Sequence, residues 1–506
     1  MVNKLYFGDN LDVLRSMEAE TVDLVYLDPP FNSKANYNVL FEAEHDAPGA
    51  QAMAFKDTWT WGEEAASAYE SVIETGGDVA LALSGLRGWI GKNGLLAYLS
   101  MMAARLTFLH KNLKKTGSLY LHCDPTAGPY LRIMLDSIFG HRGFRNEIAW
   151  CYNKWSTEAK QFARNHDTIL FYTKGERWTY NVQYVEPSAG TQKRWGGKRQ
   201  QAFFDESGRR FASSTEEDAK SPCPDWWPVS ILNPNASERM GYPTQKPLAI
   251  LERIVAASSN PGDLILDPFC GCGTAIEAAE KLGRRWLGID VTHFAVTVIE
   301  ERLARWQPQA RFRVHGRPKD MNGARELAAR DKHQFEWWAA WLLGASSYAE
   351  RKKGPDKGVD GRIVYKNGPF GAGTIIISVK GGENIGVGMV RELLGTLDVH
   401  GAQMGILILL NPPTKNMVSE AHAAGFVSPS AHERLPRVQI VTVEDLFHQR
   451  LPKLPPLARG ERHAMPTVKS ERDQLELFLP VAGGEVPKIG GKGVIVDPRF
   501  RKMGQR

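Results

Sequence analysis

The stretch that decides the fold is Leu264-Ile265-Leu266-Asp267-Pro268-Phe269-Cys270-Gly271-Cys272-Gly273-Thr274. It begins as a short apolar run of strand length, passes through a glycine-rich turn and leads into a helix expected over 275–282. A second buried strand is expected over 285–290, ending on Asp290. This order of strand, turn, helix and strand predicts a parallel α/β sheet, in which ligands bind beyond the carboxyl ends of the strands.

Several residues of this unit are suited to a nucleotide-like ligand. Gly271 and Gly273 let a ligand approach the backbone, and the helix that starts near Thr274 favours a carboxylate at its N-terminus. Asp290, at the end of the next strand, is placed to accept hydrogen bonds from ribose hydroxyls. A dinucleotide site is the alternative, but Ile276 occupies the position of the third glycine in the Gly-x-Gly-x-x-Gly pattern.

A second loop, Asp28-Pro29-Pro30-Phe31, directly follows the buried run Val22–Leu27. An aromatic amine is a poor nucleophile because its lone pair is delocalised into the ring. The Asp28 carboxylate and the Pro29 carbonyl would each accept a hydrogen bond from one N–H of the amine. These hydrogen bonds would draw the nitrogen towards tetrahedral geometry and free the lone pair. Phe31 offers a flat face on which an extruded base can stack. We therefore interpret the loop as a site for modifying an aromatic amine, with a proline-rich turn as the alternative.

Composition limits the classes of protein to consider. The chain has 506 residues, of which 42% are hydrophobic and 24% charged, a balance typical of a soluble globular protein with about three domains. No apolar run reaches the roughly 20 residues of a membrane span, and the five cysteines form neither a disulfide framework nor a zinc spacing. A cytoplasmic protein without membrane contact is expected. The net charge of +6 is compatible with a polyanionic partner.

Periodicity divides the chain into parts. The expected parts are a first α/β block (1–310), a linker (307–320), a second α/β block (325–450) and a flexible basic tail rich in Pro and Gly (451–506). Within the first block, residues 34–92 are less periodic and predict a long excursion from the sheet. Residues 175–240 lose periodicity altogether and are basic and aromatic, which predicts an insertion.

The order of these motifs resembles the beta group of DNA amino-methyltransferases, in which the catalytic tetrapeptide precedes the S-adenosylmethionine loop. The resemblance covers about residues 1–305. The motifs that carry it are Gly8-Asp9-Asn10, Asp28-Pro29-Pro30-Phe31, His166-Asp167-Thr168-Ile169-Leu170-Phe171-Tyr172-Thr173-Lys174 and Thr244-Gln245-Lys246-Pro247-Leu248. It implies a Rossmann-like, S-adenosylmethionine-dependent methyltransferase sheet, with 175–240 as the target-recognition insertion.

The resemblance also implies roles for individual residues. The residues implied to bind the cofactor are Asp9, Lys246, Asp267, Phe269, Gly271, Gly273, Thr274 and Asp290. Within this set, Asp9 would accept from the adenine amine of S-adenosylmethionine, Lys246 would lie near the donor's carboxylate, and Asp290 would hold the ribose.

The implied reaction is direct transfer of a sulfonium methyl group to an amine of double-stranded DNA, with Asp28-Pro29-Pro30-Phe31 as the catalytic residues. The resemblance favours adenine N6, with cytosine N4 as the alternative; RNA or a protein glutamine is a further alternative substrate. A cytosine C5 enzyme would need a cysteine nucleophile after proline. Pro222-Cys223 has this dipeptide, but it lies in the insertion and is interpreted as a turn.

A second set of chemically suggestive residues lies in the later block. Asp360 precedes a strand, Lys380 ends the buried strand that begins at Thr374, and Glu336 lies on an aromatic-rich helix. An acid at the start of a strand can bind a divalent metal beside a phosphodiester. A lysine on the neighbouring strand can then position or deprotonate the attacking water.

This block resembles the Mrr-like branch of the PD-(D/E)xK restriction nucleases over about residues 325–430, which implies a smaller α/β restriction-endonuclease-like domain. The matching stretches are Gly358-x-Asp360-Gly361, Ser378-x-Lys380, Leu393-Leu394-Gly395 and Gly401-Ala402-x-x-Gly405. The resemblance implies Asp360 as a ligand of Mg²⁺, Lys380 as the catalytic lysine and Glu336 as an additional metal ligand. Ser378 departs from the family, because most members have an acid there; Glu392 on the next helix could compensate.

Together these features predict a fused restriction-modification protein that methylates DNA and cuts it. The alternative is a methyltransferase whose C-terminal block only binds DNA or a partner. The chain contains no Gly-x-x-x-x-Gly-Lys-Ser/Thr phosphate loop, so no intrinsic ATPase is expected. The oligomeric state and the recognised DNA sequence are left open.

Overall fold

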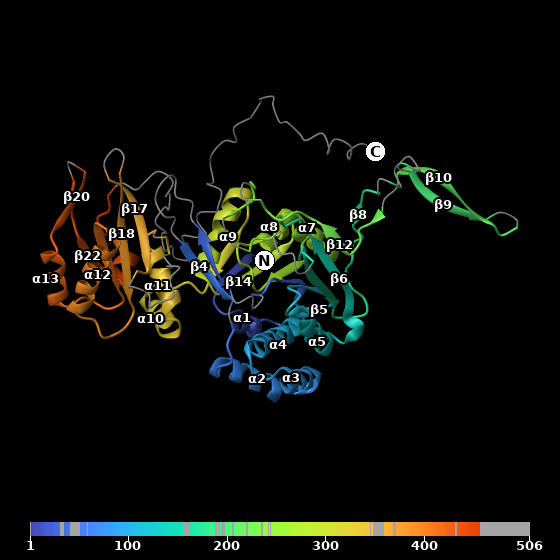
Figure 1. Cartoon of the computed structure of the whole chain (residues 1–506), viewed down its shortest axis with the longest axis horizontal. Coiled ribbons are helices and arrows are strands. Elements are labelled where there is room, and N and C mark those ends of the chain that lie inside the picture. Colours follow the sequence, from blue (N-terminus) through green and yellow to red (C-terminus); the bar gives the residue numbers. More distant parts are fainter. Residues whose placement is uncertain are drawn as a thin grey trace, which may run out of the picture. The chain divides into compact units, whose positions relative to one another are not determined.

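The computed structural model contains two α/β blocks, each built around its own sheet (Figure 1). The structure describes residues 2–30, 35–40, 51–57, 59–154, 162–187, 190, 193, 198–204, 207–218, 221–233, 236–240, 242, 244–344, 346–347, 359–367, 371–430 and 433–455. The expected tail, apart from its first five residues, lies outside these ranges.

The first block contains a nine-stranded sheet. In spatial order its strands are β12 (Trp226–Pro228), β6 (Phe144–Cys151), β7 (His166–Thr173), β5 (Leu113–Cys123), β2 (Val22–Leu27), β13 (Leu264–Asp267), β14 (Arg285–Asp290), β1 (Asn3–Phe7) and β15 (Phe312–His315). Strands β5, β2, β13, β14 and β1 are parallel, whereas β7 runs antiparallel between β5 and β6. The carboxyl ends of the parallel strands therefore share one edge of the sheet with the first residues of β7.

Helices cover both faces of this sheet (Figure 1). One face carries α1 (Asn10–Ser16), α2 (Glu63–Thr75), α3 (Gly77–Ile90), α4 (Gly94–Asn112) and α5 (Gly128–Phe139); the other carries α7 (Leu248–Ser258), α8 (Thr274–Lys281) and α9 (His293–Trp306). Helix α4 begins where the Asn93 side chain accepts from the Leu96 amide, and Leu96 and Leu99 are fully buried in the core. On the opposite face, the Tyr120 hydroxyl lies 2.7 Å from that of Ser258 in α7.

The structure refines one expectation about this block and corrects another. The excursion from the sheet expected over 34–92 contains helices α2 and α3, which occupy most of 59–92. The expected linker 307–320 contains β15, which pairs in parallel with β1 and so belongs to the first sheet.

The expected insertion at 175–240 contains short strands in its described part. These are β8 (Tyr184–Val185), β9 (Lys198–Phe204), β10 (Arg210–Asp218) and β11 (Ser221–Pro222), followed by β12. Strands β9 and β10 pair as an antiparallel hairpin, and β12 returns to pair with β6 at the edge of the main sheet. A further hairpin, β3 (Ala35–Leu40) with β4 (Gln51–Asp57), lies in the earlier excursion.

The second block contains a five-stranded mixed sheet. Its order is β16 (Ser346–Ser347), β17 (Gly361–Asn367), β18 (Gly371–Lys380), β19 (Met404–Leu409) and β22 (Val438–Thr442). The other elements are α10 (Met321–Arg330), α11 (Lys332–Trp341), α12 (Val387–His400), α13 (Lys415–Ala423), β20 (Phe426–Ser430), β21 (Glu433–Pro436) and α14 (Val443–Phe447). Strands β18, β19 and β22 are parallel, and α12 and α13 bury their apolar side chains against them. Within the described ranges, no helix has the length and apolar character needed to cross a bilayer.

Candidate active site

The two loops singled out in the sequence leave neighbouring strands of the first sheet. Strand β2 pairs with β13 in parallel, with Leu24 opposite Ile265, so Asp28 and Asp267 emerge at the same edge. The side-chain amide of Asn10, the first residue of α1, donates to the Pro268 carbonyl at 2.7 Å and so ties the glycine loop to the turn after β1. The loops that follow β1, β2 and β13 therefore share one edge of the sheet.

The glycine loop after β13 has a shape that side chains would block. Gly271 and Gly273 have φ angles of +49° and +76°, in the left-handed region that favours glycine. A Cβ added to Gly273 would lie 2.7 Å from the Cγ1 of Ile299. Phe269 donates its amide to the Asp267 carboxylate at 3.1 Å, and Thr274, the first residue of α8, is buried. Glycine at position 273 is therefore required both by the left-handed backbone and by the close approach of Ile299.

Asp290 closes the glycine loop from the next strand. Its carboxylate accepts from the amide of Gly271 at 2.9 Å, and from the amide and hydroxyl of Thr292, both at 2.8 Å. Burial raises the pKa of Asp290 to about 6 despite these hydrogen bonds. Burial also raises the pKa of Asp267 well above its ordinary value, and the nearby charge of Asp28 adds to this.

Asp9 lies at the same edge, after β1. Its side chain caps α1 by accepting from the Leu11 amide at 2.8 Å, and it also accepts from Arg105 at 2.7 Å. Arg105 additionally donates to Asn10 at 2.5 Å. Arg105 was not predicted from the sequence, because it lies in the middle of α4 and has no motif around it.

The carboxylate of Asp28 is surrounded by charged and polar side chains. Lys246 donates to both of its oxygens, at 2.7 and 2.9 Å, and His122 Nδ1 lies 3.4 Å from Oδ1. On the far side of the ring, His122 Nε2 lies 3.3 Å from Asp167. Asp167 in turn accepts from the hydroxyl of Tyr152 at 3.2 Å. Lys246, expected beside the methyl donor's carboxylate, therefore pairs with Asp28.

His122, Asp167 and Tyr152 were not among the predicted site residues. They come from β5, the start of β7 and the residue after β6, three strands that are adjacent in the sheet. The only signal in the sequence was His122, a histidine near the end of the buried run 118–123, and no motif surrounds it. Of the predicted catalytic loop, Pro29 is buried beside Asp28 and Pro30 is half-buried, whereas Phe31 lies outside the described residues.

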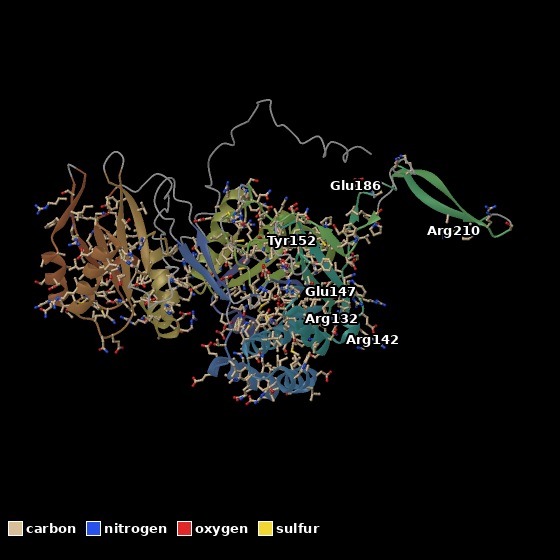
Figure 2. The ribbon with its side chains drawn as sticks, in the orientation of Figure 1. Arg132, Arg142, Glu147, Tyr152, Glu186 and Arg210 are labelled. Atoms are coloured by element: carbon tan, nitrogen blue, oxygen red, sulfur yellow. The ribbon has the colours of Figure 1, made fainter. Side chains whose placement is uncertain are left out.

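The insertion offers basic and aromatic side chains. Arg145 of β6 lies over the ring of Trp178 at 3.6 Å, and Trp226 on β12 is exposed. Arg210 lies on the β9–β10 hairpin and Tyr152 directly after β6, as Figure 2 shows. Pro222-Cys223, interpreted from the sequence as a turn, instead lies at a strand: Pro222 ends β11, and the Cys223 amide donates to the Gln183 carbonyl at 2.8 Å.

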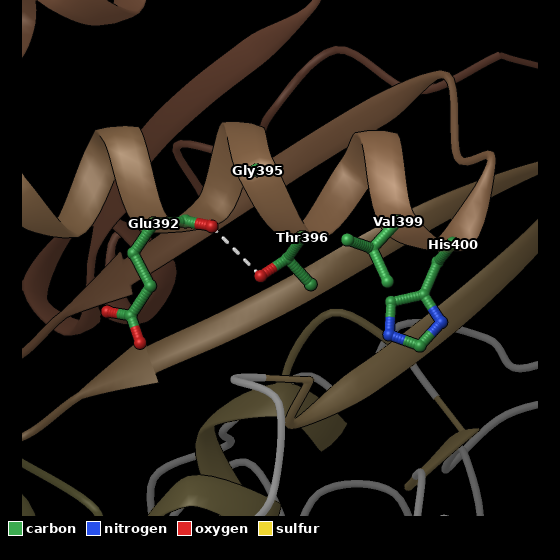
Figure 3. Close-up of a pocket in the computed structure, with 5 residues that line it drawn as sticks. All are labelled: Glu392, Gly395, Thr396, Val399 and His400. Atoms are coloured by element: carbon green, nitrogen blue, oxygen red, sulfur yellow. Dashed lines mark hydrogen bonds between the residues drawn. The ribbon is translucent and has the colours of Figure 1, made fainter.

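In the second block, Asp360 and Lys380 lie on neighbouring strands. The amide of Val379 donates to the Asp360 carboxylate at 2.6 Å, and Lys380 at the end of β18 lies 3.8 Å from Glu392 of α12. Ser378, two residues before Lys380 on β18, is buried. Glu392 also borders an open depression on α12, lined by Glu392, Gly395, Thr396, Val399 and His400 (Figure 3).

Glu336, the other predicted metal ligand, has partners on its own helix. It lies 3.6 Å from Lys332 and 3.3 Å from His333, and its side chain is largely buried. In the part of the chain that the structure describes, no three His, Cys, Asp or Glu side chains form a cluster suited to a metal ion. A metal here would have at most two carboxylates and would retain water or phosphate as its other ligands, as Mg²⁺ commonly does.

Comparison with known proteins places both blocks. Residues 22–301 match the family model described as DNA methylase, and residues 327–444 match the model described as restriction endonuclease. The Type II methyltransferase M.EcaI of Enterobacter cloacae is 30% identical over 41% of this chain and 58% of its own length. The DNA adenine methyltransferase YhdJ of Escherichia coli (strain K12) is 26% identical over 56% of this chain and 76% of its own.

Among solved structures, the cytosine-N4-specific PvuII DNA methyltransferase matches with 16% identity and a TM-score of 0.36. The match covers 60% of this chain and 86% of that protein. The chain spans less than two thirds of the length of M.EcaI.

Proposed function

Since the chain belongs to the DNA methylase family and also carries a restriction endonuclease domain, we propose that it methylates adenine N6 in a specific DNA sequence and cleaves DNA. The observation that carries the first activity is the exit of the Asp28 and Asp267 loops from neighbouring parallel strands. We assign the methyltransferase to residues 1–310 extended to the end of β15, target recognition to 175–240 and the nuclease to 325–450.

The glycine loop fits S-adenosylmethionine, because its tight left-handed turn joins the carboxyl end of β13 to the N-terminus of α8, where α/β sheets bind nucleotide-like ligands. S-adenosylmethionine, which is consumed as a substrate, supplies an electrophilic methyl group on a sulfonium. Asp290 would bind its ribose, whereas Asp9 would accept from its adenine amine. The remaining cradle would be formed by Asp267, Phe269 and Thr274.

Asp28 and the Pro29 carbonyl would orient the target amine by accepting a hydrogen bond from each of its two N–H groups. Lys246 fixes the Asp28 carboxylate through both oxygens, so the acceptor is held in place before the base arrives. Because the sulfonium charge disappears during transfer, the buried surroundings of Asp28 and Asp267 favour the reaction. A stacking face for the base is assigned to Phe31.

The test is transfer of labelled methyl groups from S-adenosylmethionine to duplex DNA, followed by identification of the modified nucleoside. We expect N6-methyladenine, as the similarity to the DNA adenine methyltransferase YhdJ suggests. Asp28→Asn should bind the donor but transfer nothing, whereas Asp12→Asn, at an exposed acid of α1, should behave as the natural protein. If the product is N4-methylcytosine instead, the target base is cytosine. Undiminished transfer by Asp28→Asn would contradict the proposed role of the loop.

For the second block we propose Mg²⁺-dependent cleavage of DNA. Asp360 would bind the metal, Lys380 would position the attacking water, and either Glu336 or Glu392 would supply a second carboxylate. Glu392 is supported by its proximity to Lys380, which compensates for the neutral Ser378.

The test is incubation of plasmid DNA, methylated and unmethylated, with the protein and Mg²⁺. We expect nicking or linearisation that Lys380→Ala abolishes and Lys415→Ala, at an exposed lysine of α13, preserves. Separate Glu336→Gln and Glu392→Gln variants identify the second carboxylate. Intact plasmid in both methylation states would leave a domain that only binds DNA.

A further inference from the structure

A row of four polar side chains crosses the edge of the first sheet, and only one of them belongs to the Asp-Pro-Pro-Phe loop. Asp28 follows β2, His122 is the second-last residue of β5, Asp167 is the second residue of β7 and Tyr152 follows β6. The His122 side chain is completely buried, while those of Asp28 and Asp167 are 18% and 22% exposed. A buried imidazole thus lies between two carboxylates that each reach the surface of the site.

We propose that Asp28, His122 and Asp167 form a proton relay that removes the proton released by the target amine during methyl transfer. This inference rests on the proposed methyltransferase function and deepens it. His122 acts through Asp28 and is therefore a positioning residue rather than one that touches the base.

The electrostatics of Asp167 fix the orientation of the histidine. Burial would raise the pKa of Asp167, but hydrogen bonds from His122 and Tyr152 and the charge of Lys246 lower it below its ordinary value. Asp167 is therefore ionised at neutral pH, and it favours the His122 tautomer that carries its hydrogen on Nε2. The lone pair of Nδ1 then faces Oδ1 of Asp28.

That arrangement leaves a place for one proton between Asp28 and His122. The groups that face the imidazole are Asp28, Asp167 and the ring of Trp150, with Lys246 behind Asp28 and Tyr152 behind Asp167. With neutral histidine, the two carboxylates and one ammonium sum to a charge of −1. One additional proton between Asp28 and His122 neutralises the cluster, so the site is prepared to accept it.

The reaction supplies that proton. The amine nitrogen forms a bond to the methyl carbon while the carbon–sulfur bond breaks and leaves its electron pair on sulfur. As the nitrogen becomes cationic, one of its N–H bonds breaks with the electron pair remaining on nitrogen. The proton passes through Asp28 to His122 Nδ1, and the Nε2 proton passes to Asp167. With a base seated over Asp28, Asp167 provides the route to water that Asp28 has lost.

The test compares single-turnover methyl transfer by four proteins between pH 5.5 and 9. His122→Gln keeps a donor for Asp167 but cannot relay a proton, and Asp167→Asn removes the outlet at a partly exposed position. His110→Gln is the control, since His110 contacts Phe139 within α4 and α5 and lies outside the site. Donor affinity and thermal unfolding are measured for each variant.

We expect His122→Gln and Asp167→Asn to slow transfer about 10²-fold without changing donor affinity. The pH profile of the rate should differ between the natural protein and both variants, because each substitution removes a titratable group of the relay. Rates within twofold of the natural protein with an unchanged pH profile would overturn the relay while leaving methyl transfer intact. An inert natural protein would instead overturn the proposed function. If His122→Gln does not fold, Asp167→Asn alone decides.

Discussion

The affinity for S-adenosylmethionine should depend on pH through Asp290. Burial raises the pKa of this carboxyl from 3.8 to about 6, and a ribose diol donates better to its ionised form. If only the ionised form binds, the apparent affinity scales with the ionised fraction, which falls from about 0.9 at pH 7 to about 0.1 at pH 5. We therefore expect the dissociation constant to rise about tenfold between these pH values, as measured by calorimetry.

The effect on folding has the opposite sign. Because the folded protein holds the Asp290 proton more tightly than the unfolded chain does, this carboxyl contributes stability below its ordinary pKa, and that contribution is lost as pH rises through about 6. The Asp290→Asn variant should bind the donor weakly at pH 7, and its affinity should no longer change between pH 5 and pH 7. Asp267 is unchanged in this variant. A flat profile for the natural protein, or an unchanged slope in Asp290→Asn, would refute the assignment of Asp290 to the ribose.

Three further predictions concern the framework of the cofactor site. Gly273→Ala should cost at least about 1–2 kcal/mol of stability and weaken donor binding, because the left-handed backbone disfavours a side chain and the new Cβ would meet Ile299; unchanged thermal unfolding would contradict this. Arg302→Met should cost about 3–5 kcal/mol in denaturant unfolding, because it leaves Glu277 buried without its partner at 2.6 Å, and adding Glu277→Leu should recover most of the loss. Arg105→Met should weaken donor binding several-fold, since Arg105 holds the carboxylate expected to meet the donor's adenine; unchanged affinity would argue against that role.

Local patterns predicted the strands, the glycine loop and the two acids at strand ends, because each is encoded within a few consecutive residues. The neighbours of those residues depend on strand order, which local periodicity does not contain. Asp28 and His122 are far apart in the chain and meet because β5 pairs with β2. Asp167 reaches the same edge only because β7 is antiparallel, and β15 was missed because a four-residue strand beside a linker has little periodicity.

The strand order also explains how one carboxylate can serve two partners. On one side of β2, β13 and β14 present the glycine loop and Asp290, which are suited to the methyl donor. On the other side, β5 and β7 present His122 and Asp167, which are suited to proton removal. Since β2 lies between these pairs of strands, Asp28 is positioned where the incoming methyl group and the departing proton must both pass. Exchanging the residue at position 28 should therefore abolish methyl transfer, because it removes both the orientation of the amine and the first acceptor of its proton, whereas changes at His122 should slow transfer only through impaired proton removal.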